Sequence, residues 1–558
     1  MTTYVIASGG HILGASGSVY AVSSGSSPGF PTTYPKVALV GNGGDASYGQ
    51  DSTSGFVSYT ASAPTTPAGI GVQSVGAYDL AILGGSFEGS SAYSGTKRQN
   101  LITALKGGGT YPIALNASRP TKCFPYAIME SGLASGASGG YAGFNNICLS
   151  NNWWAWNAAG GTGSKLTRSG TINASTQYEI NYGYAWDTSA GSAGLDQPIC
   201  GNVYGTLSAG QGPAQTAATY FASGLLTTNP QDSRFLSLTN GAAPNADGVF
   251  LDNCFIFPDG GGALTSSTGY WDGINSFNNN AIAAYPTGTS SLLARGQYHF
   301  FQTFQSYLAT CNPGSTYYNF GNFGDYWNSV GYGNIGSLTA NGAASTFHGG
   351  LVEGAFGIPS SSYQAFQTYA DMQGNYVNIM AFCLSPQAVV IGSWLPATDG
   401  SFTATFTTGG TATVAATGTA LEYQLMRLGL CFTLVNGNAY YGTGNDGYNW
   451  ATTRWYDEFG DDSLTQVNVP RGYLGTPVNG TLTIITLSNG VQLRAFTGGV
   501  AMINPWGNGP QTVTSSMLAA QGFTGLFHLN GTQNPTLNNG GAFSSWSAAD
   551  ADGLILPY

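Results

Sequence analysis

Residues 245–255, Asn-Ala-Asp-Gly-Val-Phe-Leu-Asp-Asn-Cys-Phe, form the stretch around which the rest of the chain is organised. Its apolar run has a β-branched and aromatic core and ends in Asp252-Asn253, which predicts a short buried strand with a carboxylate at its C-terminal end. In a barrel of parallel strands, the carboxyl ends of the strands form the floor of the active site, so Asp252 is a candidate catalytic residue. Asx residues also cap loops, and a purely structural role for Asp252 and Asn253 stays open at this point.

Short apolar runs of this kind recur between residues 36 and 458 and alternate with segments of helical periodicity. Strands are predicted at residues 36–41, 78–83, 124–130, 247–252, 317–320, 347–353, 378–382 and 388–391. Helices are predicted at residues 97–106, 216–226, 290–311 and 361–373, and a long apolar element that contains Arg427 covers residues 421–434. The alternation indicates parallel βα units and hence an α/β fold.

Three segments do not follow this alternation. Residues 1–35 are rich in Gly, Ser and Pro and are expected to form an N-terminal arm or a small β elaboration that contacts a neighbour. Residues 400–418 alternate Thr with Phe, Ala and Val, which predicts a β-hairpin inserted into the barrel of residues 36–465. Residues 466–558 are expected to form a C-terminal antiparallel β domain, because their short apolar runs are separated by Asn-Gly and Gly-Gly turns. These runs lie at 481–485, 491–496 and 500–504.

The composition argues against two classes of partner. Only 7% of the 558 residues are charged and 42% are hydrophobic, with 84 glycines, which is typical of a loop-rich globular protein. A net charge of −11 with only 14 Lys and Arg residues disfavours nucleic acid, because binding a phosphate backbone needs clustered cations. The longest clean apolar run near the centre of the chain, residues 428–435, is far too short to span a membrane. No basic residue precedes Lys36, so no secretory signal is recognised.

No motif predicts a metal or a cofactor. The seven cysteines contain no Cys-x-x-Cys pair, and Cys254, Cys383 and Cys431 lie in apolar runs, so they are interpreted as small buried hydrophobic residues. Asp45 and Asp51 lack the spacing of a calcium loop. The sequence at 136–140 matches the nucleophile elbow of serine hydrolases, but it lies in a tract of Gly, Ala and Ser where such a match is uninformative.

Two more predicted strands end in an acid. The strands at 124–130 and 347–353 end in Glu130 and Glu353, and the chain contains only six glutamates, which makes chance a weaker explanation. Three tryptophans fall within residues 153–156, and this group, with Trp154 at its centre, either packs under the barrel or stacks on sugar rings.

Five motifs occur in the chain in a characteristic order. They are Asp-Gly-Val-Phe-Leu-Asp-Asn at 247–253, Gly-Gly-Leu-Val-Glu-Gly at 349–354, Met-Arg-Leu-Gly-Leu at 426–430, Trp-Tyr-Asp-Glu-Phe-Gly at 455–460, and Asn-Gly-Val-x-x-Arg-x-Phe with Ile-Asn-Pro at 489–505. Together they resemble hypothetical glycoside-hydrolase-like TIM-barrel proteins, and the first motif is also similar to endo-α-1,4-polygalactosaminidases. The resemblance implies a (β/α)8 TIM barrel whose strand-end acids act on a glycosidic bond, followed by a β domain. It does not reach residues 1–35, and the hairpin at 400–418 has no counterpart in it.

Glycoside hydrolysis requires two carboxyl groups that face each other across the scissile bond. Asp252 is assigned as nucleophile or base and Glu353 as acid, because a glutamate reaches further and apolar surroundings, such as Phe347 and Phe356, more readily raise its pKa. Asp247 is expected to be structural, and Glu458 and Asp457 are rival acids. The candidate substrate contacts are Glu130, Trp154, Asn253, Asn319 and Asp457.

Two functions from different classes remain open. One is a depolymerase that cleaves an extracellular or cell-surface polysaccharide, and the other is a non-catalytic structural or carbohydrate-binding barrel. The abundance of Gly, Ser, Thr and Asn, the scarcity of Lys and the Met-Thr-Thr start resemble phage tail proteins. This composition favours a virion or extracellular location, with homo-oligomer or virion assembly partners, and a phage tail can itself carry a depolymerase.

Overall fold

The computed structural model describes the elements that form the barrel and the C-terminal sheets. The described residues are 6–7, 11–13, 19–21, 30–41, 76–83, 119, 121–128, 131–133, 167–172, 175–179, 246–252, 318–322, 348–352, 355–356, 362–365, 368–394, 403–407, 411–414, 418–444, 455–460, 468–478 and 482–558. The helices predicted at 97–106, 216–226 and 290–311 lie outside them.

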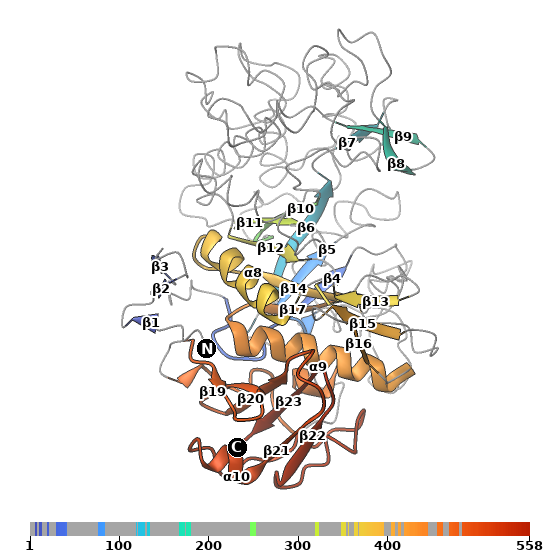
Figure 1. The fold of residues 1–558 in the computed structure, drawn as a ribbon. Helices are drawn as coiled ribbons and strands as arrows, with labels where there is room; N and C mark the ends of the chain where they lie inside the picture. Colours follow the sequence, from blue (N-terminus) through green and yellow to red (C-terminus); the bar gives the residue numbers. More distant parts are fainter. Residues whose placement is uncertain are drawn as a thin grey trace, which may run out of the picture.

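Eight parallel strands close into a barrel (Figure 1). In chain order they are β4 (Val37–Gly41), β5 (Leu80–Leu83), β6 (Lys122–Ile128), β10 (Gly248–Asp252), β11 (Tyr318–Asn322), β12 (Gly349–Val352), β14 (Val390–Trp394) and β17 (Tyr440–Gly444). Each strand pairs with the next one along the chain, and β17 returns to pair with β4. The predicted parallel barrel is therefore confirmed, whereas its full set of eight outer helices stays a prediction.

Apolar side chains at alternate strand positions fill the barrel. They are Ala38, Val40, Leu80, Ile82, Phe124, Phe250, Tyr318, Phe320, Leu351, Ala388, Val390 and Tyr440, joined by Phe30. Large and small residues complement one another: the ring centroids of Phe124 and Phe320 lie 4.5 Å apart, and a Cβ on Gly349 would meet the Phe320 ring at 2.6 Å. Because this interior is a packed core, a ligand has to bind at one end of the barrel.

Phe30 packs into the amino-terminal end of the barrel. Its ring meets Tyr318 edge-on at a centroid distance of 4.9 Å, and Lys122 Nζ lies 4.9 Å from the centroid of the Phe30 ring. Tyr34, a few residues further on, is also buried and packs against Phe496 of the C-terminal sheet. Residues 30–35, predicted as part of the N-terminal arm, thus pack on the barrel of their own chain.

Two of the predictions between residues 361 and 382 are wrong. The predicted helix at 361–373 is in fact β13 (Ser362–Ala365) followed by the start of α8 (Tyr369–Phe382), and the predicted strand at 378–382 lies inside α8. Thr368 caps α8 by accepting a hydrogen bond from the Asp371 amide. Buried Met372, Tyr376 and Ile379 recur at helical spacing, and packing of this face overrides the strand preference of the local residues.

Several small sheets and a long helix surround the barrel. The predicted hairpin is confirmed as β15 (Thr403–Thr407) and β16 (Thr411–Val414), to which β13 adds a parallel strand. Two further sheets contain β7 (Ser131–Leu133), β8 (Thr167–Ile172) and β9 (Ser175–Glu179), and β1 (Ile6–Ala7), β2 (His11–Leu13) and β3 (Val19–Ala21). The apolar element at 421–434 is α9 (Gly418–Asn436), and no helix among the described residues is long and apolar enough to cross a membrane.

The C-terminal part is antiparallel β structure, as predicted, and it packs on α9 (Figure 1). One sheet contains β18 (Ile485–Thr486), β19 (Gln492–Phe496), β20 (Gly499–Asn504) and β23 (Asp552–Pro557), and a second contains β21 (Gln511–Thr514) and β22 (Ser545–Ala548), with α10 (Ser515–Ala519) beside it. A Cβ on Gly553 would lie 2.5 Å from the Arg427 carbonyl oxygen, so the backbones of β23 and α9 approach closely. The boundary predicted at residue 466 stays a prediction.

Candidate functional site

The carboxyl ends of β6, β10, β11 and β12 are neighbours in the barrel, because β10 pairs with β6 on one side and with β11 on the other, and β11 pairs with β12. The register sets Ile128 opposite Asp252, and Asn322 opposite Leu351. Asp252 is the last residue of β10, as predicted. The structure therefore describes a continuous rim of four strand ends that includes Asp252.

Side chains below this rim point into the packed interior. Phe250 and Phe320 are buried core residues, and positions 252 and 322 follow them by two residues on the same strand faces. Asn322 is 3% exposed and is the last residue of β11. This strand lies between β10, which ends at Asp252, and β12, which ends just before Glu353. An amide in this place can donate and accept hydrogen bonds.

Sequence analysis proposed Asn319 rather than Asn322 as a substrate contact. The signal that would have identified Asn322 is its two-residue spacing from Tyr318 and Phe320, both of which are buried in the core. Position 319 alternates with these residues, and it stays a prediction because the structure describes its backbone alone.

Most of the other predicted site residues lie outside the described part of the chain. Glu353 directly follows the last residue of β12, and Glu130 comes two residues after the end of β6. Asn253 follows β10, and Trp154 lies between β7 and β8. Their roles stay predictions.

Asp457 and Glu458 belong to a 3-10 turn, η8 (Asp457–Phe459), in which both are buried. Asp457 accepts a hydrogen bond from the Gln533 amide at 2.9 Å, and Glu458 accepts one from Asn538 Nδ2 at 3.1 Å. Burial raises the pKa of the Glu458 carboxyl, although the charge of Arg427 and the Asn538 bond oppose the shift. These contacts with the C-terminal part favour structural roles, and the prediction that Asp457 contacts substrate remains untested.

The surroundings expected for Glu353 are only partly described. Phe356 is fully buried, and its ring packs against Phe432 of α9 and Trp506 at centroid distances of 5.2 and 6.2 Å. Phe347 lies outside the described residues. The apolar environment assigned to Glu353 therefore stays a prediction.

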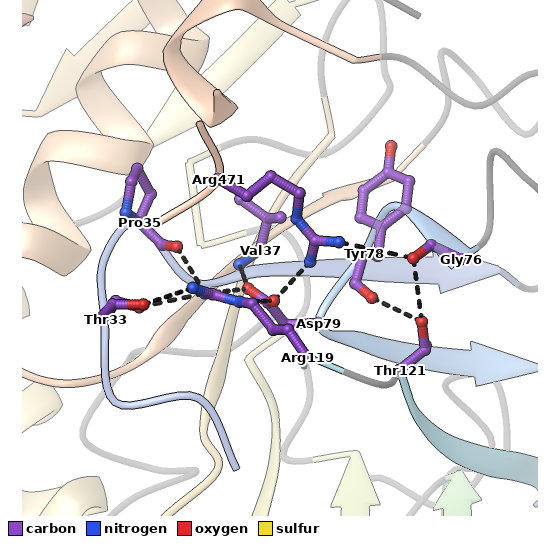
Figure 2. Close-up of polar contacts among 9 residues, drawn as sticks. All are labelled: Thr33, Pro35, Val37, Gly76, Tyr78, Asp79, Arg119, Thr121 and Arg471. Atoms are coloured by element: carbon purple, nitrogen blue, oxygen red, sulfur yellow. Dashed lines mark hydrogen bonds and ion pairs between the residues drawn. The ribbon is translucent and has the colours of Figure 1, made fainter. Parts of the chain in front are cut away.

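The opposite end of the barrel holds a cluster of paired charges around Asp79, just before β5 (Figure 2). The Asp79 carboxylate accepts hydrogen bonds from Arg119 Nε and Nη2, from Arg471 Nη2 and from the Val37 amide. Arg119 also donates to Thr33 Oγ1 at 2.6 Å and to the Pro35 carbonyl oxygen at 3.0 Å. Burial alone would raise the pKa of Asp79, but the two guanidinium groups outweigh it and lower that pKa.

A second ion pair lies at the same end. Asp247 precedes β10, and its carboxylate accepts hydrogen bonds from Lys122 Nζ at 3.1 Å and from the Cys123 amide at 2.8 Å. These contacts favour the structural role predicted for Asp247. Both clusters hold the amino ends of strands together, so the chemistry of the barrel is to be sought at the other end.

No residues in the described part of the chain suggest a metal site. Among them, no group of three or more His, Cys, Asp and Glu side chains can hold a metal ion. Cys383 and Cys431 are free and buried, as predicted, and burial raises the pKa of both thiols, which disfavours the reactive thiolate. Cys254 lies outside the described residues.

Comparisons with known proteins do not place the chain in a family. No protein-family model matches it, and no curated protein does. Among solved structures, a cycloisomaltooligosaccharide glucanotransferase from Paenibacillus sp. aligns with 82% of this chain and 45% of its own, at 10% identity and a TM-score of 0.29. A cyclic α-maltosyl-(1→6)-maltose hydrolase from Arthrobacter globiformis aligns with 94% of this chain and 99% of its own, at 9% identity and a TM-score of 0.35. The chain thus spans less than half of the first protein, and similarity at these scores leaves function to be argued from the barrel itself.

Proposed function

We propose that this chain is a glycoside hydrolase whose reaction takes place at the carboxyl end of the barrel. One observation carries the proposal: β10 ends on Asp252, and β12, two strands away, ends immediately before Glu353. Strand ends at this rim are where barrel enzymes hold their catalytic groups. At the amino end, Asp79 and Asp247 are already engaged in ion pairs with Arg119, Arg471 and Lys122.

The register supports a working distance between the two acids. Asp252 and the level of Leu351 are separated by two strand spacings of about 4.8 Å each, and Glu353 comes two residues after Leu351 in the sequence. A carboxyl separation of about 5–10 Å, which glycoside hydrolysis requires, is then within reach of an aspartate and a glutamate.

Each acid would have a distinct task. The Glu353 carboxyl transfers its proton to the glycosidic oxygen as the bond to the anomeric carbon breaks. The Asp252 carboxylate either attacks that carbon or takes a proton from the water that does so, and the electron pair of the broken bond leaves on the protonated oxygen.

A hydrolysis assay over a panel of polysaccharides tests this proposal. The wild-type chain should release reducing ends from at least one glycan, and Asp252→Asn and Glu353→Gln should each lower that rate by about 100- to 10,000-fold. Asp371→Asn, which removes an exposed carboxylate at the start of α8, is the matched control and should keep the wild-type rate. Equal rates in all four proteins would reject the assignment.

A non-catalytic role in a phage tail or virion is the alternative, and the low charge content and abundant Gly, Ser, Thr and Asn favour it. In that case the rim would bind a polysaccharide without cleaving it, and the chain would assemble with copies of itself or with other virion proteins. Binding of a glycan without release of reducing ends, together with recovery of the chain in purified particles, would support this alternative. Hydrolysis by the particle-bound protein would show that the chain is both a virion component and a glycoside hydrolase.

A further inference from the structure

A cavity of about 700 Å³ lies in the C-terminal part of the chain, away from the barrel rim. Its lining comes from α9, from residues 528–544, from β22 and from the first residue of β23. No strand of the barrel contributes to it. The volume falls within the range of about 300–1,000 Å³ that small-molecule sites occupy, so it can hold a few sugar rings.

The two charged residues of the lining, Arg427 and Asp552, neutralise each other. Arg427 Nε and Nη2 donate to the two Asp552 carboxylate oxygens at 3.0 and 3.1 Å, and both residues are buried. Arg427 Nη1 is also buried, without a hydrogen-bond partner. His528, another lining residue, is neutral near pH 7, because burial lowers its pKa below the usual 6.5. The lining therefore carries no net charge.

The remaining polar groups of the lining are neutral amides and hydroxyls. Asn534 and Thr536 come from the segment before β22, and Ser545 and Ser547 alternate along β22 on its exposed side, with Trp546 facing the core. Within the described part of the chain, the side chains of Asn534, Thr536, Ser545 and Ser547 make no hydrogen bond. Groups that both donate and accept match the hydroxyls of a sugar.

We infer that this cavity is a second glycan-binding site, which takes a neutral oligosaccharide segment. A phosphate or polyuronate ligand would require unpaired cations, whereas the guanidinium group of Arg427 is engaged by Asp552. The choice of a glycan as the ligand rests on the proposed function. The cavity would hold one part of a polysaccharide while the barrel rim acts on another part of the same polysaccharide. Linking two sites on one polymer increases the overall affinity for long chains.

The test compares binding by two matched double variants of the full chain. Asn534→Ala/Thr536→Ala removes one amide and one hydroxyl from the cavity, and Gln521→Ala/Thr524→Ala removes the same groups from an exposed turn outside it. Affinity electrophoresis through gels that contain neutral polysaccharides, with a polyuronate gel for comparison, gives the dissociation constants. Far-UV and near-UV circular dichroism establish that both variants are folded.

The cavity variant should bind its preferred neutral polysaccharide at least 10-fold more weakly than wild type, while the control variant binds as wild type does. Both should hydrolyse a short soluble oligosaccharide at the wild-type rate. Equal affinity in all three proteins, or stronger retention in the polyuronate gel, would overturn the inference. Cavity-dependent binding without hydrolysis would overturn only the proposed function, and hydrolysis without cavity-dependent binding would overturn only this site.

Discussion

Acidic residues occur at both ends of the barrel, and those at the amino end are paired with cations. At the amino end, Asp79 and Asp247 precede their strands and bind Arg119, Arg471 and Lys122. At the carboxyl end, Asp252 ends β10 beside the buried amide of Asn322. The chain has only 14 Lys and Arg residues, and three of them bind the carboxylates of Asp79 and Asp247. The ion pairs hold the strands together at the amino end, which leaves the carboxyl end as the proposed place of the reaction.

The largest expected effect is on catalysis, from Asp252→Asn at the carboxyl end. The amide can neither attack the anomeric carbon nor accept a proton from water, so the hydrolysis rate should fall by about 100- to 10,000-fold. The urea midpoint should stay close to that of wild type. If Asp252→Asn kept full hydrolytic activity but had a lowered urea midpoint, Asp252 would be a stabilising residue and not a catalytic one.

The largest expected effect on stability comes from Asp79→Asn at the amino end. The substitution leaves Arg119 and Arg471 buried without their counter-charge, which should lower the free energy of unfolding by about 3–5 kcal/mol. Urea unfolding at pH 7 measures the loss, and the folded fraction should keep the wild-type rate of hydrolysis.

The pH dependence of this difference gives a second check. Because the folded state lowers the pKa of Asp79, its stabilisation is present above the unfolded pKa near 3.8 and is lost as the pH falls through the lower folded value. The gap between wild type and Asp79→Asn should therefore shrink below about pH 4. A gap that stays constant down to the acid transition would argue against an ionised Asp79.

His348, just before β12, should make the barrel sensitive to acid. Burial against the Tyr318 ring lowers its pKa from 6.5 to about 4, so the unfolded chain binds a proton between these values and the folded chain does not. Stability should fall by up to roughly 3 kcal/mol as the pH drops from 6.5 to 4. Urea unfolding of His348→Phe across this window should show a smaller loss than wild type, and an equal loss would assign the effect to other groups.

The smallest expected effect concerns the packing of the barrel interior. A Cβ on Gly349 would lie 2.4 Å from the Ala388 carbonyl oxygen and 2.6 Å from the Phe320 ring, so Gly349→Ala should lower the free energy of unfolding by about 1–3 kcal/mol. Gly374→Ala is the matched control, because this position in α8 has nothing within 4 Å. It should raise stability by about 0.5–1 kcal/mol, through helix propensity alone. Thermal unfolding measures both changes in stability, which should have opposite signs.

Strands with a strong apolar pattern were predicted well, and elements that depend on their neighbours were not. β10 and β12 were found because β-branched and aromatic residues occupy short runs between turns. β17 was missed because Gly442 and Gly444 interrupt its apolar pattern, although Gly442 fits where Val390 and Val40 fill the barrel. The residues of α8 favour a strand locally, and burial of Met372, Tyr376 and Ile379 on one face overrides that preference.

The candidate site was predicted in the same uneven way. The strand end at Asp252 was predicted because it closes an apolar run, whereas the buried position of Asn322 was not predicted. Residue type alone does not distinguish Asn319 from Asn322. The two differ in their position relative to the buried face of β11.

The sequence by itself determined that short buried strands recur along the chain and that one of them ends on an aspartate, because residue periodicity and strand-end chemistry are local properties. Only the tertiary structure decided which charges meet. Asp79 pairs with Arg119 across 40 positions and with Arg471 across 392, because barrel closure brings their segments together. An ion pair depends on distance in space, and no pattern of neighbouring residues encodes that distance.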